Sequence, residues 1–284
     1  MQITVGALTF DADPAGPADG SSVLLLHGFP DGARCWAPVT AVLAGAGLRC
    51  LAPNQRGYSP GARPDSVEEY RLELLVQDAV GMLDALGVRR THLVGHDWGA
   101  VVAWVLAARH PHRVHSLTAV SVPHPAAFGA ALRSDPDQQR RSEYLRLFRE
   151  PSPRPEAVLL ADGARRLRAM YSGSTLAPDQ VEALVEPLLA PGALTAALNW
   201  YRAMTADSYA QIPPVTVPTT YVWGGLDVAV GRRAATTTTT EHVTGDYRFV
   251  ELPQASHWIP EQLPDLLAAL ALERIRSVEQ DTTG

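Results

Sequence analysis

Residues Thr91–Trp104, THLVGHDWGAVVAW, predict a β-strand, a tight turn and the start of an α-helix. At the centre of the turn stands Gly95-His96-Asp97-Trp98-Gly99. Two glycines at this spacing let a strand pass directly into a helix and lift the side chain between them above the sheet. In the nucleophile elbow, which has this form, the raised residue is usually serine. Here it is Asp97, and the strand–turn–helix unit predicts an α/β fold.

The carboxylate of Asp97 points to a particular chemistry. A free aspartate has a pKa of about 3.9, so it is ionised at neutral pH and needs no base before it attacks. Attack on a carbonyl would give an anhydride, whereas attack on an sp3 carbon gives an ester that water can hydrolyse. Asp97 therefore predicts alkyl transfer to the enzyme followed by hydrolysis. The alternative is that Asp97 only caps the following helix.

Short apolar runs separated by helical patterns predict a mostly parallel sheet flanked by helices. The runs are continuous rather than alternating, as in strands buried on both faces. Helical periodicity follows in Ser66–Leu86, Trp98–Arg109 and Leu263–Leu272. Strands alternating with helices predict a doubly wound sheet. The predicted strands are Ser22–Leu26, Leu48–Ala52, Thr91–Val94, Val114–Val122, Thr219–Trp223 and Tyr247–Leu252.

The strand pattern stops between His124 and Ile212, where the sequence predicts only helices. We therefore expect a core formed by residues 1–123 and 212–284 and a helical cap formed by residues 124–211. Ligands of open α/β sheets bind outside the carboxyl ends of the strands, so a cap inserted there would cover the site. The predicted cap helices are Pro136–Arg149, Pro155–Tyr171, Pro178–Leu188 and Ala193–Met204. The five-threonine run Thr236–Thr240 disfavours a helix and suggests no function.

Composition limits the partners and the location. The chain has 284 residues, 46% of them hydrophobic, and a formal net charge of −6 without any lysine. This charge does not favour nucleic acid or an anionic membrane. No signal peptide and no apolar run of about 18 residues is visible, so we expect a cytoplasmic protein. Cys35 and Cys50 are expected to be buried free thiols.

Hydrolysis of an ester on Asp97 requires a base, and the C-terminal part of the sequence offers one. His257 follows the last predicted strand, and Asp227 follows the strand before it. Elbow hydrolases order nucleophile, acid and histidine in this way along the chain. A histidine oriented by a carboxylate can activate water. The alternatives are a histidine satisfied within its loop and an aspartate that forms the turn after Gly224-Gly225.

Two backbone amides are candidates for an oxyanion hole. One belongs to Trp98, directly after the nucleophile, and the other to Phe29, in the loop after the strand Ser22–Leu26. Pro30 has no N–H group and cannot donate. The Phe29-Pro30 bond is a candidate cis peptide. The alternative is a plain turn at the strand end.

Several motifs together resemble the α/β-hydrolase-fold epoxide hydrolases of the Asp-nucleophile branch. They are HGFP at His27–Pro30, GHDWG around Asp97, QRGYSPG at Gln55–Gly61, the distal Asp227, and SHW with His257. The resemblance implies a helical cap inserted after the sixth core strand. It also implies a small-molecule epoxide as substrate. We expect no metal or organic cofactor, and a monomer or homodimer.

An epoxide oxygen is a poor leaving group and needs hydrogen-bond donors. In the epoxide hydrolases that this sequence resembles, two tyrosines of the cap supply them. The resemblance assigns these positions to Tyr144, in YLRLFREP, and Tyr201, in LNWYRAM. A tyrosine with a pKa of about 10 stays protonated and can donate. Each is alternatively a core tyrosine of its helix, and Tyr171 and Tyr209 are weaker candidates.

Two other functions remain open on the sequence. Haloalkane or haloacid dehalogenases use the same triad, and a halide leaves without a proton but is held by N–H donors. Trp98 and Trp200 offer such donors, and we place Trp200 and Pro30 at the substrate. The third possibility is a ligand-sensing hydrolase relative that binds without turnover. The two tyrosines favour the epoxide.

Overall fold

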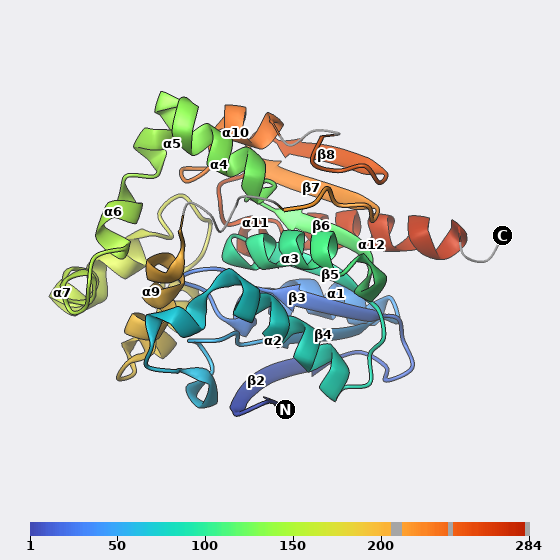
Figure 1. The fold of residues 1–284 in the computed structure, drawn as a ribbon, viewed down its shortest axis with the longest axis horizontal. Coiled ribbons are helices and arrows are strands. Elements are labelled where there is room, and N and C mark those ends of the chain that lie inside the picture. Colours follow the sequence, from blue (N-terminus) through green and yellow to red (C-terminus); the bar gives the residue numbers. More distant parts are fainter. Residues whose placement is uncertain (206–211, 238–240, 282–284) are drawn as a thin grey trace.

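A single eight-stranded sheet, with order β1-β2-β4-β3-β5-β6-β7-β8, forms the centre of the molecule (Figure 1). The structure is a computed structural model and describes residues 1–205, 212–237 and 241–281. Strands β3 to β8 are parallel to one another, whereas β1 and β2 run antiparallel at one edge. The strands are β1 Gln2–Val5, β2 Leu8–Ala15, β3 Ser22–Leu26, β4 Arg49–Pro53, β5 Thr91–His96, β6 Val114–Val120, β7 Thr219–Gly224 and β8 Tyr247–Leu252.

The mostly parallel sheet and the six predicted strands are confirmed, but the sequence analysis missed β1 and β2. Every residue of β5 and β7 is buried, which explains their continuous apolar runs. The missed strands are only partly buried, and their sequences mix polar and apolar residues. An antiparallel edge exposes much of its surface, so no long apolar run marks it.

Helices cover both faces of the sheet. In Figure 1, α2 and α3 lie in front of the strands and α1 and α12 lie behind them. α3 lies against β5 and β6, and its first eleven residues are buried. The helices of the core are α1 Ala37–Gly45, α2 Leu72–Ala85, α3 Trp98–Arg109, α10 Arg232–Thr236, α11 Ile259–Gln262 and α12 Pro264–Asp281. Short 3-10 helices are η1 Ala33–Trp36, η2 Pro60–Ala62, η3 Val67–Tyr70, η4 Pro111–Arg113 and η5 Glu186–Leu189.

Between β6 and β7, the described residues form a series of helices and contribute no strand to the sheet. The predicted helix Pro136–Arg149 is two helices, because Ser142 and Glu143 interrupt it. α7 is also broken, since its backbone is not helical at residues 161–164. The helices are α4 Pro125–Ser134, α5 Pro136–Arg141, α6 Tyr144–Phe148, α7 Arg154–Ala169, α8 Pro178–Val185 and α9 Ala193–Ala203.

These inserted helices occupy two places in Figure 1. α4 and α5 lie beside α10, next to β7 and β8. α6, α7 and α9 lie on the left of the view, beyond the left end of α3. The predicted end of the cap at residue 211 falls outside the described residues, as does most of the threonine run, of which Thr236 ends α10.

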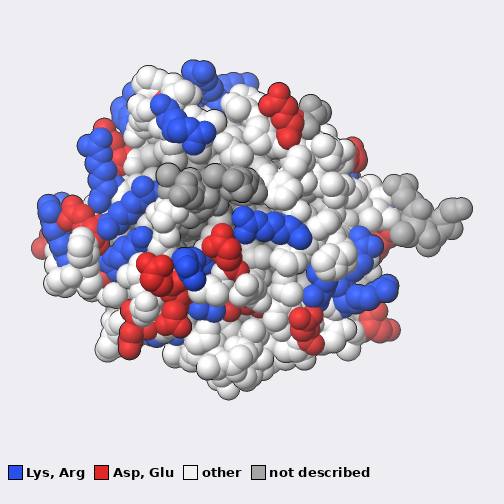
Figure 2. Space-filling model, viewed as in Figure 1, with Lys and Arg blue, Asp and Glu red and all other residues white. Residues whose placement is uncertain are grey.

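Three further features bear on the sequence predictions. Cys35 and Cys50 are free and buried, as predicted. Among the described residues, no single helix is long and apolar enough to cross a membrane. The segment Pro178–Leu189 and the helix Ala193–Ala203 pass that test only together, and they are bent by 83°. Figure 2 shows arginine and acidic side chains interspersed over the drawn face, in keeping with the small net charge.

Candidate active site

Asp97 lies at the sharp turn between β5 and α3. Its backbone has φ 52° and ψ −119°, a conformation that L-residues rarely adopt. The turn closes only because its neighbours lack side chains. A Cβ on Gly99 would lie 1.9 Å from the carbonyl oxygen of Leu26, and one on Gly95 would lie 2.4 Å from the carbonyl oxygen of Gly99. The predicted elbow is present.

The carboxylate of Asp97 lies against the loop after β3. The amide of Phe29 donates a 2.9 Å hydrogen bond to Asp97 Oδ1, and the Phe29-Pro30 peptide is cis, as predicted. A Cβ on Gly28 would lie 2.4 Å from Asp97 Oδ1. The loop therefore approaches the carboxylate closely enough for one backbone N–H to stabilise negative charge there. A matching role for the Trp98 amide stays a prediction.

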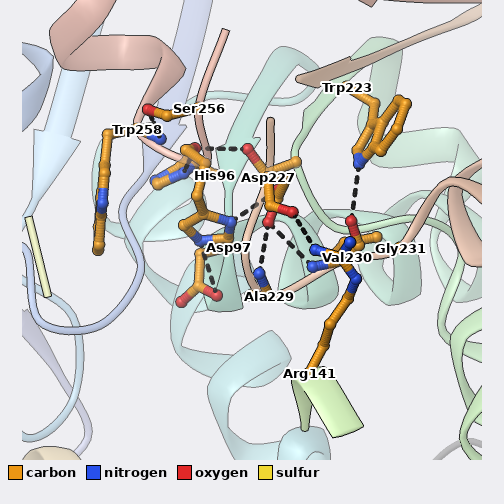
Figure 3. A network of polar contacts seen from close by, with 12 residues as sticks. His96, Asp97, Arg141, Trp223, Asp227, Ala229, Val230, Gly231, Ser256 and Trp258 are labelled. Carbon is orange, nitrogen blue, oxygen red and sulfur yellow. Dashed lines mark hydrogen bonds and ion pairs between the residues drawn. The ribbon is translucent and has the colours of Figure 1, made fainter. Parts of the chain in front are cut away.

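His257 lies between the carboxylates of Asp97 and Asp227, both of which are labelled in Figure 3. Its Nδ1 atom is 2.8 Å from Asp227 Oδ2, and its Nε2 atom is 3.5 Å from Asp97 Oδ2. The other oxygen of Asp227 accepts hydrogen bonds from the amides of Ala229 and Val230, at 2.7 and 2.9 Å. The structure thus brings together the three residues that the sequence analysis chose for the triad.

These contacts set the protonation states of His257 and Asp97. Burial lowers the pKa of His257, but the carboxylates of Asp227 and Asp97 more than offset this and hold it well above the usual 6.5. Burial alone would raise the pKa of Asp97, yet hydrogen bonding to His257 and its charge lower it below 3.8. The resting site therefore pairs a charged imidazolium with two carboxylates.

Two residues that the sequence analysis did not assign hold the backbone of His257. His96 Nε2 and Ser121 Oγ lie 2.9 and 2.7 Å from the carbonyl oxygen of His257. A carbonyl oxygen only accepts, so both groups donate. His96 directly precedes the nucleophile, and Ser121 directly follows β6. Nothing in the local sequence distinguishes them from other residues at strand ends.

Tyr144 and Tyr201 reach the same cavity as Asp97. The cavity has a volume of about 30 Å³ and is also lined by Trp98, Val122 and other apolar side chains. Tyr201 is buried, with its ring 5.2 Å from that of Trp98 and 6.4 Å from that of Tyr144. Burial and the charge of Asp97 raise the pKa of Tyr201 well above 10, so its hydroxyl stays protonated.

The two weaker tyrosine candidates lie elsewhere. The hydroxyl of Tyr171 donates a 2.6 Å hydrogen bond to Asp31 Oδ1, so this side chain joins the segment after α7 to the loop after β3. Tyr209 lies outside the described residues.

Trp200 does not offer its N–H group to the cavity beside Asp97. Its indole Nε1 donates a 2.8 Å hydrogen bond to the carbonyl oxygen of Arg56, and its ring packs edge-on against Trp98 at 5.6 Å. Trp200 lines a different small cavity, together with Arg56 and Asp78. Pro30 is buried in its loop, and its contact with substrate stays a prediction.

A larger cavity lies away from the nucleophile. It has a volume of about 500 Å³ and lies between the core loops and the segment α8–η5, with Asp31, Tyr58 and Arg63 among its lining residues. Asp97 and the two tyrosines are not part of this lining. We place the candidate site at the smaller cavity, because the side chains of Asp97, Tyr144 and Tyr201 line it together.

Asp31, in the loop after β3, forms a cluster with Cys35 and Glu261. One ligand atom each of Asp31, Cys35 and Glu261 lies within 4.8 Å of the others. Asp31 Oδ2 lies 3.5 Å from Nδ1 of the buried His96. Both carboxyl oxygens of Glu261 are buried without a hydrogen-bond partner, although Glu261 as a whole is partly exposed. Burial and the charge of Asp31 raise the pKa of Glu261 well above 4.5. A proton on Glu261 therefore relieves the repulsion between the two carboxyl groups.

Comparison with known proteins agrees with this architecture. The family model for the alpha/beta hydrolase fold matches residues 21–263. The chain belongs to the α/β-hydrolase-fold family.

Among its relatives is the AB hydrolase superfamily protein YfhM of Bacillus subtilis, 34% identical over 97% of both chains. Epoxide hydrolase A of Mycobacterium tuberculosis is 33% identical over 93% of both chains. The solved structure of Bacillus megaterium epoxide hydrolase in complex with an inhibitor superposes with a TM-score of 0.88 at 25% identity, covering 97% of this chain and 100% of that one. These similarities confirm the resemblance to epoxide hydrolases that the motifs indicated.

Proposed function

We propose that this protein is an epoxide hydrolase that converts an epoxide into a vicinal diol through an ester on Asp97. The observation that carries the proposal is the shared cavity. A carboxylate nucleophile and two tyrosines line it together, and His257 approaches the same carboxylate from the core. Relatives that are named epoxide hydrolases and align over most of their length support the proposal.

In the first step, an oxygen of Asp97 attacks an epoxide carbon and the C–O bond of the ring breaks. The electron pair of that bond goes to the epoxide oxygen, which needs a hydrogen-bond donor and then a proton. Tyr144 and Tyr201 are placed to donate, since both line the cavity beside Asp97. One of the two hydroxyls passes its proton to that oxygen, so this step yields a hydroxyalkyl ester and a tyrosinate.

In the second step, water attacks the carbonyl carbon of the ester. Esterification removes the charge of Asp97, which is one of the influences that raise the pKa of His257. Once the ester has formed, the imidazolium therefore loses its proton more readily, and this proton restores the tyrosine hydroxyl. The neutral imidazole can then accept a proton from water. The amides of Phe29 and Trp98 stabilise the oxyanion. Collapse releases the diol and restores the Asp97 carboxylate.

A dehalogenase is the second candidate, and the position of Trp200 weakens it. A halide needs N–H donors, but the indole N–H of Trp200 is bonded to the carbonyl oxygen of Arg56. A ligand-sensing protein without turnover is a third candidate. The complete Asp97–His257–Asp227 contact set argues against it, because binding alone requires no aligned base.

Turnover of styrene oxide tests the reaction class, and Asp97→Ala is the inactive control. In a single turnover in ¹⁸O-labelled water, the label should enter Asp97 and not the diol. His257→Gln should accumulate an ester that adds the mass of the substrate to the intact protein. Label that appears directly in the diol would exclude the covalent route. Conversion of 1-bromobutane without any epoxide turnover would favour the dehalogenase.

We further propose that residues 124–211 act as the cap and that the natural substrate is a small epoxide. The cavity of about 30 Å³ is far below the ~300–1,000 Å³ of common ligand pockets. Substrate entry therefore requires cap side chains to move. Two buried free thiols support a cytoplasmic location, where disulfides are rare. We expect a monomer or a homodimer, which gel filtration with light scattering distinguishes.

A further inference from the structure

We propose that Gln138, on α5 of the inserted helices, is a positioning residue. It holds the loop of Asp227 where the carboxylate of Asp227 contacts His257. This inference rests on the proposed two-step reaction and assigns a residue to its second step. Gln138 lies outside the cavity of Asp97, and neither the sequence motifs nor the triad geometry singles it out.

The side chain of Gln138 is completely buried and bonded at both ends of its amide. Nε2 donates to the carbonyl oxygen of Ala229 at 2.7 Å and to Ser142 Oγ at 2.9 Å. Oε1 accepts from the amide of Gly231 at 2.8 Å. One glutamine thus joins α5 to both ends of the three-residue segment Ala229–Gly231.

That segment is the part of the loop that orients the acid. The amides of Ala229 and Val230 hold Asp227 Oδ1, and this leaves Oδ2 to face His257 Nδ1 (Figure 3). The bonds of Gln138 therefore lie one peptide away from the bonds that aim the carboxylate. A displacement of the segment would lengthen the 2.8 Å contact to His257.

Arg141 fastens the same loop to α5 through a further hydrogen bond. Arg141 Nη1 donates to the carbonyl oxygen of Asp227 at 2.5 Å, and its Nε donates to Asp137 Oδ2 at 2.7 Å. At Gly231, a Cβ would lie 2.8 Å from Asp137 Oδ2. Because the φ of Gly231 is −76°, its backbone does not require glycine. The side chain of Asp137, on α5, lies close to this position and would have to shift to admit a Cβ.

The contacts of α5 predict an effect on one step only. Asp227 and His257 act on water in ester hydrolysis, whereas Asp97 attacks without a base. Replacing Gln138 by leucine leaves the carbonyl of Ala229 and the amide of Gly231 buried without partners, a cost that the loop relieves by moving. Slow hydrolysis with intact alkylation is therefore expected. A helix that only stabilised the fold would not separate the two steps.

The experiment compares Gln138→Leu with Gln139→Leu by single-turnover kinetics on styrene oxide. Gln139 is the adjacent residue on the same helix, but its side chain is exposed. In Gln138→Leu we expect ester hydrolysis to fall about 10- to 100-fold while alkylation changes less than about 3-fold. Intact mass should show the accumulated ester. Gln139→Leu should behave as the wild type.

The pH profile of ester hydrolysis is a second readout. Because the carboxylate of Asp227 raises the pKa of His257, a misplaced carboxylate should move the acidic limb of that profile to lower pH. If Gln138→Leu fails to fold, Arg141→Met carries the test, with the neighbouring Arg140→Met as its control. Arg140 also pairs with Asp137, but among the described residues no hydrogen bond joins it to the loop of Asp227.

Equal losses in both steps, or an unchanged rate of ester hydrolysis in a folded variant, would overturn the positioning role. The proposed function fails separately, in the wild type. A wild-type enzyme that turns over epoxide without forming an ester contradicts the two-step reaction and, with it, this inference.

Discussion

Nδ1 of His257 lies 2.8 Å from Oδ2 of Asp227, although the two residues are 30 positions apart in the chain. Asp227 follows β7 and His257 follows β8, and these two strands are parallel neighbours. Asp97 follows β5, in the same sheet. Parallel strands end at the same edge, so three short loops bring the three side chains together. The site is built from strand ends, and the inserted helices add two tyrosines to its cavity.

The substitution Asp227→Asn should stop ester hydrolysis while leaving alkylation almost intact. The amides of Ala229 and Val230 require an oxygen at the position of Oδ1. The amide nitrogen of asparagine must then face His257 Nδ1, which becomes an acceptor and places the proton on Nε2. A protonated Nε2 cannot take a proton from water, and the analogous change in a serine triad costs about 10⁴-fold in kcat. Stopped-flow kinetics with intact mass measures both steps. Hydrolysis at the wild-type rate would contradict the role of Asp227.

The substitutions Tyr144→Phe and Tyr201→Phe should slow ring opening. Each removes one donor to the departing oxygen, and loss of one such donor typically costs about 10²- to 10³-fold. Tyr171→Phe is the control, because its hydroxyl bonds to Asp31 rather than facing the cavity. Pre-steady-state alkylation rates test this. If both variants alkylate at the wild-type rate, the leaving oxygen is protonated from another source.

The substitution Gly99→Ala should prevent the elbow from closing. The added methyl group would lie 1.9 Å from the backbone oxygen of Leu26, an atom that cannot move without breaking the central sheet. We expect little folded protein, measured by yield and by thermal melting. Gly45→Ala is a suitable control, since a Cβ there meets nothing within 4 Å. A Gly99→Ala enzyme with a normal melting temperature would show that the turn tolerates a side chain.

Replacing Glu261 by glutamine should stabilise the protein at neutral and alkaline pH. Burial and Asp31 raise the pKa of Glu261 well above 4.5, so the folded state keeps a proton that the unfolded state releases. Stability from this group is full below pH 4.5 and is lost as pH rises toward the folded-state pKa. Glu261→Gln removes that loss, by up to about 1.4 kcal/mol for each pH unit between the two pKa values.

Melting temperatures across a pH series measure the effect of Glu261→Gln. The exposed substitution Glu68→Gln should leave the pH dependence of the melting temperature unchanged. If the melting temperature of Glu261→Gln follows that of the wild type at every pH, Glu261 is ionised in the folded protein and the proposed proton is absent.

Much of the site could be predicted because its residues carry local signals. Gly95 and Gly99 frame Asp97, and Asp227 and His257 each follow an apolar run that predicts a strand. The tyrosines had no such signal. Only the resemblance to epoxide hydrolases points to Tyr144 and Tyr201. Both line the cavity beside Asp97.

Other parts of the site could not be predicted, because their partners lie far away in the chain. Gln138 bonds to a carbonyl 91 residues distant, and Ser121 bonds to one 136 residues distant. A buried polar side chain needs a partner, but which partner it meets depends on how the inserted helices pack on the core. The antiparallel edge strands were missed for a similar reason, since partial exposure removes the apolar run.

A parallel sheet with an aspartate at its elbow is predictable from local sequence, because long apolar runs and paired glycines constrain the chain locally. The order of nucleophile, acid and histidine is predictable in the same way. The raised pKa of His257 is not, since it depends on two carboxylates brought from separate strand ends. The hydrogen bond of Trp200 to the carbonyl oxygen of Arg56, and that of α5 to the carbonyl oxygen of Asp227, likewise depend on the tertiary fold. Hydrogen bonds and pKa values follow distance, and distance between remote residues is set by packing.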